Sequence, residues 1–564
     1  MSQHDGVHGE AGATNEDKTG AGEPERAAGA ASTDASLEGR AKSSKRRGGR
    51  SKAWLWSLIA VIVVAALVVG VNAFFANRQD GGADGTGAGA SAAKTADTVS
   101  IGLKLAPVNL DIRHQSGSAL EQILIGNVYE SLVSRGSDNK VHPGLATRWD
   151  VSKDGLTYTF HLNDHMNFSN GDTLDAEDVA WSINELKAKQ YYNYDQVKNL
   201  DKAEAVDAHT VRLTLTAPDS NMLWYLTGRP GLVYDKDAKW DEKTGALGSG
   251  PYTVESFDPS DKIVFKANPK YWGTAHKAKT ENVIIRFLPD DNAGINALKS
   301  GDVQVLSPIT ATLAQPFRDD PNYVVKAGDG SDKFVLAFNM TNAKLTDKRV
   351  RQAIRYAIDH QQLIASRGGV DAKLGGPIPK VDPGYEDLTG VYPHDVAKAK
   401  RLMKAAGYSE SKPLELTLTY ANVYGSELGD QLKSQLKPIG IDLKINYVEF
   451  STWLQDVHTN GDYELSLVDH AESHDFYKWA TDPDYYYHYD NKEVQALYAK
   501  ALAATTDEEA SSYLAKAAKV VSEDAPADWL FSWRVTIAYA KGVEGFPQNL
   551  SQTVLPLWQV TYTK

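Results

Sequence analysis

The sequence contains no cysteine among its 564 residues. This absence excludes disulfide bonds, thiolate metal sites, cysteine nucleophiles and a lipid attached through an N-terminal cysteine. Basic charge is also in short supply, because 60 lysines and arginines stand against 73 aspartates and glutamates and the formal net charge is -13. Phosphate binding depends on clustered basic charge, so we expect no nucleic acid as the main partner.

Familiar catalytic motifs are missing as well. The chain has no G-x-x-x-x-G-K-[ST] phosphate loop, no H-E-x-x-H helix and no G-x-S-x-G nucleophile turn. With thiol chemistry excluded too, the sequence predicts a protein that is not an enzyme and that needs no cofactor.

A long uncharged run dominates the N-terminal part. Residues 53–76 carry no charge and would span about 36 Å as a helix, enough to cross a hydrocarbon core of about 30 Å. Residues 1–52 are rich in Gly, Ala, Ser and charge and end in a basic run, which predicts a disordered tail on the cytoplasmic side. Both segments are too long for a cleaved signal peptide. We therefore expect a single-pass membrane anchor, a flexible linker over residues 77–97, and an extracellular part from residue 98 onward.

The extracellular part mixes strand and helix patterns. Apolar alternation predicts strands, and an Asp-Gly pair at residues 154–155 predicts a hairpin turn. Helical spacing and end signals predict helices, one of them capped by Asp175 and another by Thr346. Strands are expected at residues 98–105, 147–151, 156–162, 206–215, 252–257, 263–267, 283–288, 333–339, 414–420, 441–448 and 463–468, and helices at 120–133, 175–189, 346–364, 395–406 and 427–436. The mixture predicts an α/β fold in which two differently built regions share one sheet.

Four sequence blocks resemble one known family. They are the stretch from Gly144 to Asn184 with its D-V-A-W-S helix, GSGPYTVESF…NPKYWG over residues 248–273, FNMTNAKLTDKRVRQAIRYAID over 338–359, and DVAKAKRLMKAAGY over 395–408. In this order they resemble the family 5 extracellular solute-binding proteins of ABC importers, which include oligopeptide-, dipeptide- and nickel-binding proteins. We expect the tryptophans in these blocks (Trp149, Trp181 and Trp272) to pack in the core and the glycines Gly248 and Gly250 to allow a tight backbone passage.

The resemblance implies a periplasmic-binding-protein-like clamshell with two lobes, of the three-domain peptide-binding type. One discontinuous lobe would comprise residues 98–137, 245–331 and 541–564, with a small domain inserted at 138–244, and the second lobe would comprise 332–540. Ligand would be enclosed between the lobes and delivered to the permease of the importer. A small molecule or an oligopeptide is the expected ligand.

The ligand site is less clear from the sequence. Peptide-binding members carry a tryptophan followed three residues later by an aspartate that receives the peptide ammonium group, and we expect no such pair in the corresponding region, residues 462–491, which includes the strand expected at 463–468. Asp475 is our first expectation for this role, with Asp469 and Glu472 as alternatives. Further expected ligand contacts are His470, Trp479, Tyr420 and Asn339.

Other interpretations of the same region stay open. His470 and His474 are four residues apart and could share a helix face, but one such pair is weak evidence and we expect no metal site. The tyrosines that follow Trp479 could stack on a sugar or pack between the lobes. An oligosaccharide-binding protein of an importer, or a tethered surface receptor or adhesin for a protein partner, are therefore the alternative functions.

Overall fold

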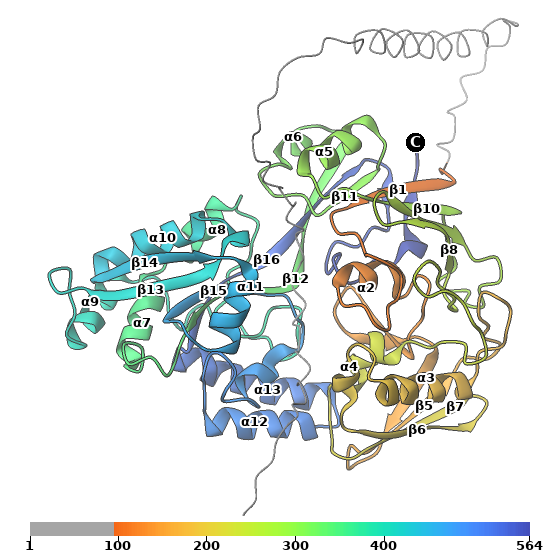
Figure 1. Ribbon diagram of the computed structural model, residues 1–564, viewed down its shortest axis with the longest axis horizontal. Helices are drawn as coiled ribbons and strands as arrows, with labels where there is room; N and C mark the ends of the chain where they lie inside the picture. Colours follow the sequence, from red (N-terminus) through yellow and green to blue (C-terminus); the bar gives the residue numbers. More distant parts are fainter. Residues whose placement is uncertain (1–94) are drawn as a thin grey trace, which may run out of the picture. The chain divides into compact units, whose positions relative to one another are not determined.

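The computed structural model describes residues 95–564 (Figure 1). The expected tail, the apolar run at residues 53–76 and nearly all of the linker lie outside these residues. Among residues 95–564, no helix combines the length and the apolar character that crossing a bilayer requires.

A ten-stranded sheet runs through the described part of the chain. Its strand order is β14-β13-β15-β12-β16-β11-β1-β10-β9-β8, so segments far apart in sequence become neighbours. β1 lies parallel to β10 and β11, and β13 lies parallel to β14 and β15. The strands are β1 (Thr98–Leu103), β8 (Tyr252–Asp258), β9 (Lys262–Ala267), β10 (Asn282–Phe287), β11 (Val305–Ser307), β12 (Tyr323–Phe338), β13 (Leu414–Ala421), β14 (Ile441–Val448), β15 (Leu465–His470) and β16 (Ala527–Ala540). The expected α/β class with one shared sheet is confirmed.

Two long antiparallel strands join the halves of this sheet. β12 has 16 residues and β16 has 14, and Figure 1 shows them side by side between β11 and β15. Their pairing is irregular between Asp329 and Lys333. The side chain of Arg534 on β16 lies 2.7 Å from that of Asp329 at this break. Residues 331–333 therefore lie where β12 passes from one half of the sheet to the other, at an interruption in its pairing with β16.

A smaller sheet contains the expected hairpin. Its order is β4-β5-β7-β6, and Gly155 in the β4–β5 turn has φ 69°, a value that favours glycine. Helix α3 packs against β6 and β7. Asp175 caps α3 as expected, by accepting from the amide of Glu177 while Asp178 bonds back to the amide of Asp175. The elements are β4 (Ala146–Val151), β5 (Thr157–Leu162), α3 (Ala176–Lys189), β6 (Leu200–Asp207) and β7 (Thr210–Leu215).

The remaining elements connect or cover these sheets. The short strands are β2 (Val133–Arg135) with β3 (Val141–Pro143), and β17 (Val543–Glu544) with β18 (Thr561–Tyr562). The helices are α2 (Ser118–Leu124), α4 (Met222–Tyr225), α5 (Asp291–Ser300), α6 (Gln315–Arg318), α7 (Lys348–Ala357), α8 (His360–Ser366), α9 (Val396–Ala405), α10 (Glu427–Leu436), α11 (Phe450–Trp453), α12 (Lys492–Ala503) and α13 (Asp507–Asp524). Single helical turns include a 3-10 segment at Asp475–Trp479 and a π segment at Leu454–Thr459.

Two helix predictions were wrong in extent. The helix expected at residues 120–133 ends at Leu124, because Gly126 takes φ 73° and the chain turns there. The helix expected at 346–364 is two helices, α7 and α8, since Ile358 has an extended backbone. The cap of α7 is Asp347 rather than Thr346, and Asp359 caps α8. Carboxylates thus cap both helices.

The family blocks have architectural roles. Trp149 and Trp272 are partly buried against the core of the small sheet, and Trp181 against the core around β1 and β10. A Cβ atom at Gly248 would lie 2.0 Å from the carbonyl oxygen of Val128, which bears out the expected tight backbone passage. The lobe and domain boundaries given above stay a prediction.

Candidate ligand-binding site

The β2–β3 hairpin contacts residues far away in sequence. Asn139, at the tip of the hairpin with φ 61°, donates from Nδ2 to Asp382 Oδ1 at 2.7 Å and to Ser473 Oγ at 2.8 Å. Ser473 Oγ and the amide of His474 also donate to the Asp382 carboxylate. Asp382 therefore gathers three donors from two different segments.

Three side chains stack beside this contact. The guanidinium carbon of Arg135 lies 5.1 Å from the ring centre of Trp224, and the Trp224 ring lies 4.2 Å from that of His474 at an interplanar angle of 19°. Arg135 Nε donates to Asn139 Oδ1 at 2.6 Å. Burial, aided by Arg135 and Lys333, lowers the pKa of His474 to about 3, so the imidazole is neutral at pH 7. Burial also lowers the pKa of Arg135 to about 10, against the opposing effect of Asp382, so its guanidinium stays charged at pH 7.

A buried lysine–carboxylate cluster adjoins the stack. Lys333 Nζ lies 3.2 Å from Asp475 Oδ1, and Lys478 Nζ lies 3.6 Å from Asp475 Oδ2. The side chains of Lys333 and Asp475 are only 3% and 6% exposed. Asp475, our first expectation for the ammonium site, is thus already paired with two cations of the protein.

Asp469 is placed differently. Its Oδ1 is buried and has no hydrogen-bond partner among residues 95–564. Burial and the neighbouring Asp332 raise the pKa of Asp469 well above its usual value, with Lys333 and Arg367 acting in the opposite direction. Burial likewise raises the pKa of Asp332 to about 6. Two neighbouring carboxyl groups in a buried setting favour a cationic partner between or beside them.

The other expected contact residues are engaged within the protein. Glu472 is half-exposed and pairs with Lys478 at 2.7 Å. His470 Nε2 lies 2.8 and 2.7 Å from two tyrosine hydroxyl groups, those of Tyr486 and Tyr487. Trp479 stacks on Tyr487 at 4.0 Å, so these two rings pack against each other, and packing between the lobes stays a prediction.

Two more expected residues have internal partners. Tyr420 is fully buried and donates to the carbonyl oxygen of Gly425. The Asn339 amide donates to Gly461 and Tyr463 and accepts from Thr341. Both side chains are satisfied by protein groups, and a ligand role for any of the seven expected residues stays a prediction.

The Trp-x-x-Asp spacing does occur within residues 462–491. Trp479 and Asp482 have it, so the expectation that this region contains no such pair was wrong. Trp479 is 4% exposed and Asp482 lies on the surface, so this pair does not place an aromatic ring and a carboxylate together around a buried ammonium group.

The histidine pair does not form a metal site. His470 ends β15, and His474 takes φ 56° before the 3-10 turn, so the two do not share a helix face. Within residues 95–564, the one group of side chains with metal-ligand spacing is Asp111, His114 and Glu242. Arg113 donates to Glu242 at 3.1 Å, which supplies a cation of the protein at that place.

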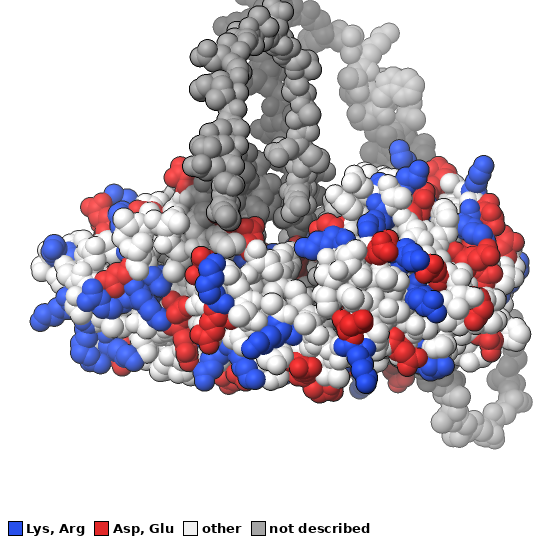
Figure 2. Space-filling model, turned by 90° about the horizontal axis from the view of Figure 1, so that it is seen from below, with Lys and Arg blue, Asp and Glu red and all other residues white. Residues whose placement is uncertain are grey.

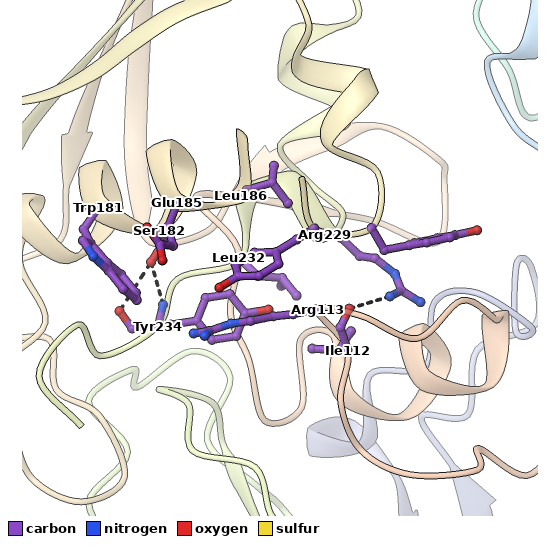
Figure 3. A pocket seen from close by; sticks show the side chains of 11 residues that line it. Ile112, Arg113, Trp181, Ser182, Glu185, Leu186, Arg229, Leu232 and Tyr234 are labelled. Carbon is purple, nitrogen blue, oxygen red and sulfur yellow. Dashed lines mark hydrogen bonds between the residues drawn. The ribbon is translucent and has the colours of Figure 1, made fainter. Parts of the chain in front are cut away.

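A separate pocket lies near that group (Figure 3). Arg113 lies over the Tyr234 ring at 3.9 Å, and Arg229 donates to the carbonyl oxygen of Ile112 at 2.5 Å. Trp181 and Tyr191 also lie within 6 Å of the Arg113 guanidinium. Because Arg113 itself occupies the aromatic surroundings, we assign the candidate ligand site elsewhere. It comprises the stack of Arg135, Trp224 and His474 together with Asp469, and the Lys333 charge acts on both His474 and Asp469.

Sequence interpretation missed Arg135, Trp224 and Asp332. Arg135 and Trp224 come from separate segments that only tertiary structure brings to His474, so no spacing could connect them. Lys333 offered one signal, because it is a charged residue that begins the apolar stretch KFVLAF of β12. Elsewhere the surface has mixed charge, and Figure 2 shows Lys and Arg interspersed with Asp and Glu on one face.

Comparison with known proteins identifies the family. Residues 140–496 match the model of bacterial extracellular solute-binding proteins, family 5. The chain belongs to this family. It is therefore a solute-binding protein of an ABC importer and not an enzyme.

Several individual proteins are similar to this solute-binding protein. The glutathione-binding protein GsiB of Salmonella typhimurium is 25% identical over 455 residues, which cover 77% of this chain and 88% of GsiB. The structure of DppA from Helicobacter pylori in complex with the peptide STSA has a TM-score of 0.66 and 24% identity, covering 83% of this chain and 98% of DppA. NikA from Brucella suis in complex with Fe(III)-EDTA has a TM-score of 0.72 and 22% identity, covering 82% and 99%. These structures confirm the periplasmic-binding-protein-like fold.

Proposed function

We propose that this solute-binding protein captures short peptides with a free amino terminus and delivers them to the permease of its importer. We further propose that residues 53–76 anchor it in the cell membrane, with the N-terminus in the cytoplasm and the binding part outside. Binding encloses the peptide, and the permease accepts it from the enclosed form. No covalent step takes place on this chain.

The observation that carries the peptide proposal is the Asp469 carboxylate. Its buried Oδ1 lacks a donor among residues 95–564, and Asp332 lies close enough to raise its pKa. Burial without a partner favours the protonated form of this carboxyl group, and an ammonium group would supply the charge and the hydrogen bonds that stabilise the carboxylate. Tyr424 lies beside this carboxyl group, since the Asp469 amide donates to the Tyr424 hydroxyl at 3.3 Å, and an aromatic ring next to a carboxylate suits a cation.

The names of similar proteins support a peptide. GsiB is named for glutathione, and DppA was solved with the peptide STSA; both ligands carry a free amino group. An oligosaccharide has less support, since Trp479 and Tyr487 stack on each other at 4.0 Å and leave those ring faces to internal packing. A protein partner has no comparable observation in its favour.

Calorimetric titration tests the proposal with glutathione and Ser-Thr-Ser-Ala, each free and N-acetylated. We expect N-acetylation to weaken binding to the wild-type protein by about 2 to 4 kcal/mol, or about 30-fold to 1000-fold. Asp469→Asn should weaken binding of the free peptide by a similar factor, and N-acetylation should then cost little more, because both changes delete one interaction. Asp442→Asn, an exposed acid on β14, serves as the control. Equal binding of free and acetylated peptides by the wild type would remove the ammonium site from Asp469.

The anchor is tested by fractionation. Full-length protein should sediment with membranes, and removal of residues 1–97 should release it without changing peptide affinity. Full-length protein found free in the medium at its intact mass would contradict the anchor.

A further inference from the structure

Two buried hydrogen-bond donors near His474 have no acceptor in the part of the chain that the structure describes. Arg135 Nη2 and Trp224 Nε1 are buried, and neither has a hydrogen-bond partner among residues 95–564. Both are obligate donors, since neither a guanidinium nor an indole N–H can accept. They belong to one cluster, because the Arg135 guanidinium lies 5.1 Å from the Trp224 ring centre. Leaving two buried donors unpaired costs free energy that an acceptor would recover.

The acids around Arg135 are already committed. Asp382 and Glu121 are the carboxylates that act on the Arg135 charge. The Asp382 carboxylate accepts from Asn139, Ser473 and the His474 amide. Glu121 accepts from Arg229 Nε at 2.6 Å. Arg135 therefore has no ion pair within 4 Å among the described residues, although its guanidinium is charged and largely removed from water.

The donors are also held in place. Asn139 Oδ1 accepts from Arg135 Nε at 2.6 Å, and the His474 ring stacks on the Trp224 ring at 4.2 Å. His474 Nδ1 lies 3.4 Å from Asn221 Oδ1, so a proton on Nδ1 can be donated to that oxygen. In this tautomer Nε2 is an acceptor, and Nε2 has no hydrogen-bond partner among residues 95–564. A preorganised arginine binds an anion with less loss of side-chain entropy.

We propose that Arg135 and Trp224 bind the carboxylate of the captured peptide, so that the ligand is held as a zwitterion with its negative end at these donors. This inference rests on the proposed function and extends it, since Asp469 receives the positive end. A planar guanidinium with a free Nη2, and an indole N–H beside it, match the two oxygens of one carboxylate. Because Asn139 also contacts Asp382 and Ser473, the carboxylate lies where the β2–β3 hairpin meets the segments 381–382 and 473–474.

The first experiment uses full-length protein and the pair Ser-Thr-Ser-Ala and its C-terminal amide. Amidation should weaken binding to the wild type about 10-fold to 100-fold. Arg135→Gln should weaken binding of the acid by a similar factor, and the amide should then bind the variant about as well as the acid does. Trp224→Phe keeps the ring, removes the N–H, and should cost the acid form about 3-fold to 10-fold. Arg148→Gln, which removes a 63% exposed arginine on β4, is the control for loss of one positive charge and should change nothing.

A second measurement does not depend on the ammonium site. N-acetylalanine presents a peptide-like carboxylate without an amino group, and the Trp224 indole ¹⁵N–H resonance, assigned by its loss in Trp224→Phe, reports on its binding. The resonance should shift with N-acetylalanine, not with N-acetylalanine amide, and not in Arg135→Gln. A shift that is unchanged in Asp469→Asn supports the carboxylate site even if neither peptide binds, in which case only the proposed peptide function fails.

Two results overturn the inference. One is an equal loss of affinity for acid and amide in Arg135→Gln, which makes Arg135 structural. The other is a Trp224 resonance that N-acetylalanine leaves in place at millimolar concentration. If in either case N-acetylation still weakens peptide binding at Asp469, the peptide proposal stands without a carboxylate site at Arg135.

Discussion

Replacement of Asp475 by Asn distinguishes a structural role from a ligand role for the residue that the sequence favoured. The Asp475 carboxylate is 6% exposed and lies 3.2 Å from Lys333 Nζ, which is itself 3% exposed. Asn keeps the shape and removes the charge. We expect the variant to lose stability and to retain its preference for a free peptide amino group.

The size of the stability loss depends on the hydrogen-bond acceptors that Lys333 and Lys478 retain in the variant. Breaking a buried ion pair by removing one partner costs about 3 to 5 kcal/mol, because the other charge is left without compensation. Lys333 Nζ retains the carbonyl oxygens of Ser331 at 3.0 Å and Glu472 at 2.7 Å, and Lys478 retains the Glu472 carboxylate at 2.7 Å. These remaining acceptors place the expected loss in the free energy of unfolding near the lower end, at about 3 kcal/mol.

Urea unfolding of wild type, Asp475→Asn, Lys333→Met and the double variant measures this loss. The double variant should be more stable than the sum of the single losses predicts, because it leaves no unpaired Lys333 charge. Asp490→Asn is the control, since Asp490 and its partner Lys492 are 51% and 79% exposed, and an exposed pair contributes about 1 kcal/mol or less. If Asp475→Asn unfolds like the wild type and loses only its discrimination between free and N-acetylated peptide, Asp475 binds the ammonium group and the reasoning here is refuted.

Three further changes have defined outcomes. Gly248→Ala should destabilise the protein by about 1 to 3 kcal/mol or more in urea unfolding, because its Cβ would lie 2.0 Å from a backbone oxygen; equal stability would mean that the backbone there moves freely. Burial raises the pKa of the Asp528 carboxyl group, but His360 and Arg355 bring that pKa below its usual value. The stability that the charged Asp528 contributes should therefore be present above about pH 4 and disappear as the pH falls through the folded-state pKa. Asp528→Asn should remove that acid-dependent loss. Burial and Arg135 lower the pKa of His474 to about 3, so the unfolded chain binds a proton that the folded chain does not, and stability should fall as the pH drops from about 6.5 toward 3. His474→Gln should flatten that slope, and an unchanged slope would show that His474 is protonated in the folded protein.

Much of the architecture can be predicted from local sequence patterns. The capped helix after Asp175, the hairpin at Gly155 and strands β13 and β14 depend on periodicity and end signals within one segment. The helix errors came from the same source. Gly126 and the extended Ile358 interrupt helical patterns that apolar spacing alone continues, because burial of an apolar side chain does not require helical backbone.

The ligand site is a different case. The sequence by itself predicted a binding protein. It also showed an acid-rich segment at residues 469–475, since those residues are neighbours along the chain. Only the tertiary structure decided which acid has a partner. Lys333 reaches Asp475 because β12 and β15 pair, with Lys333 opposite His470. Arg135 and Trp224 meet His474 through contacts between distant segments. Charge compensation is set by distances of a few ångströms in space, and sequence order does not encode those distances for residues more than a hundred positions apart.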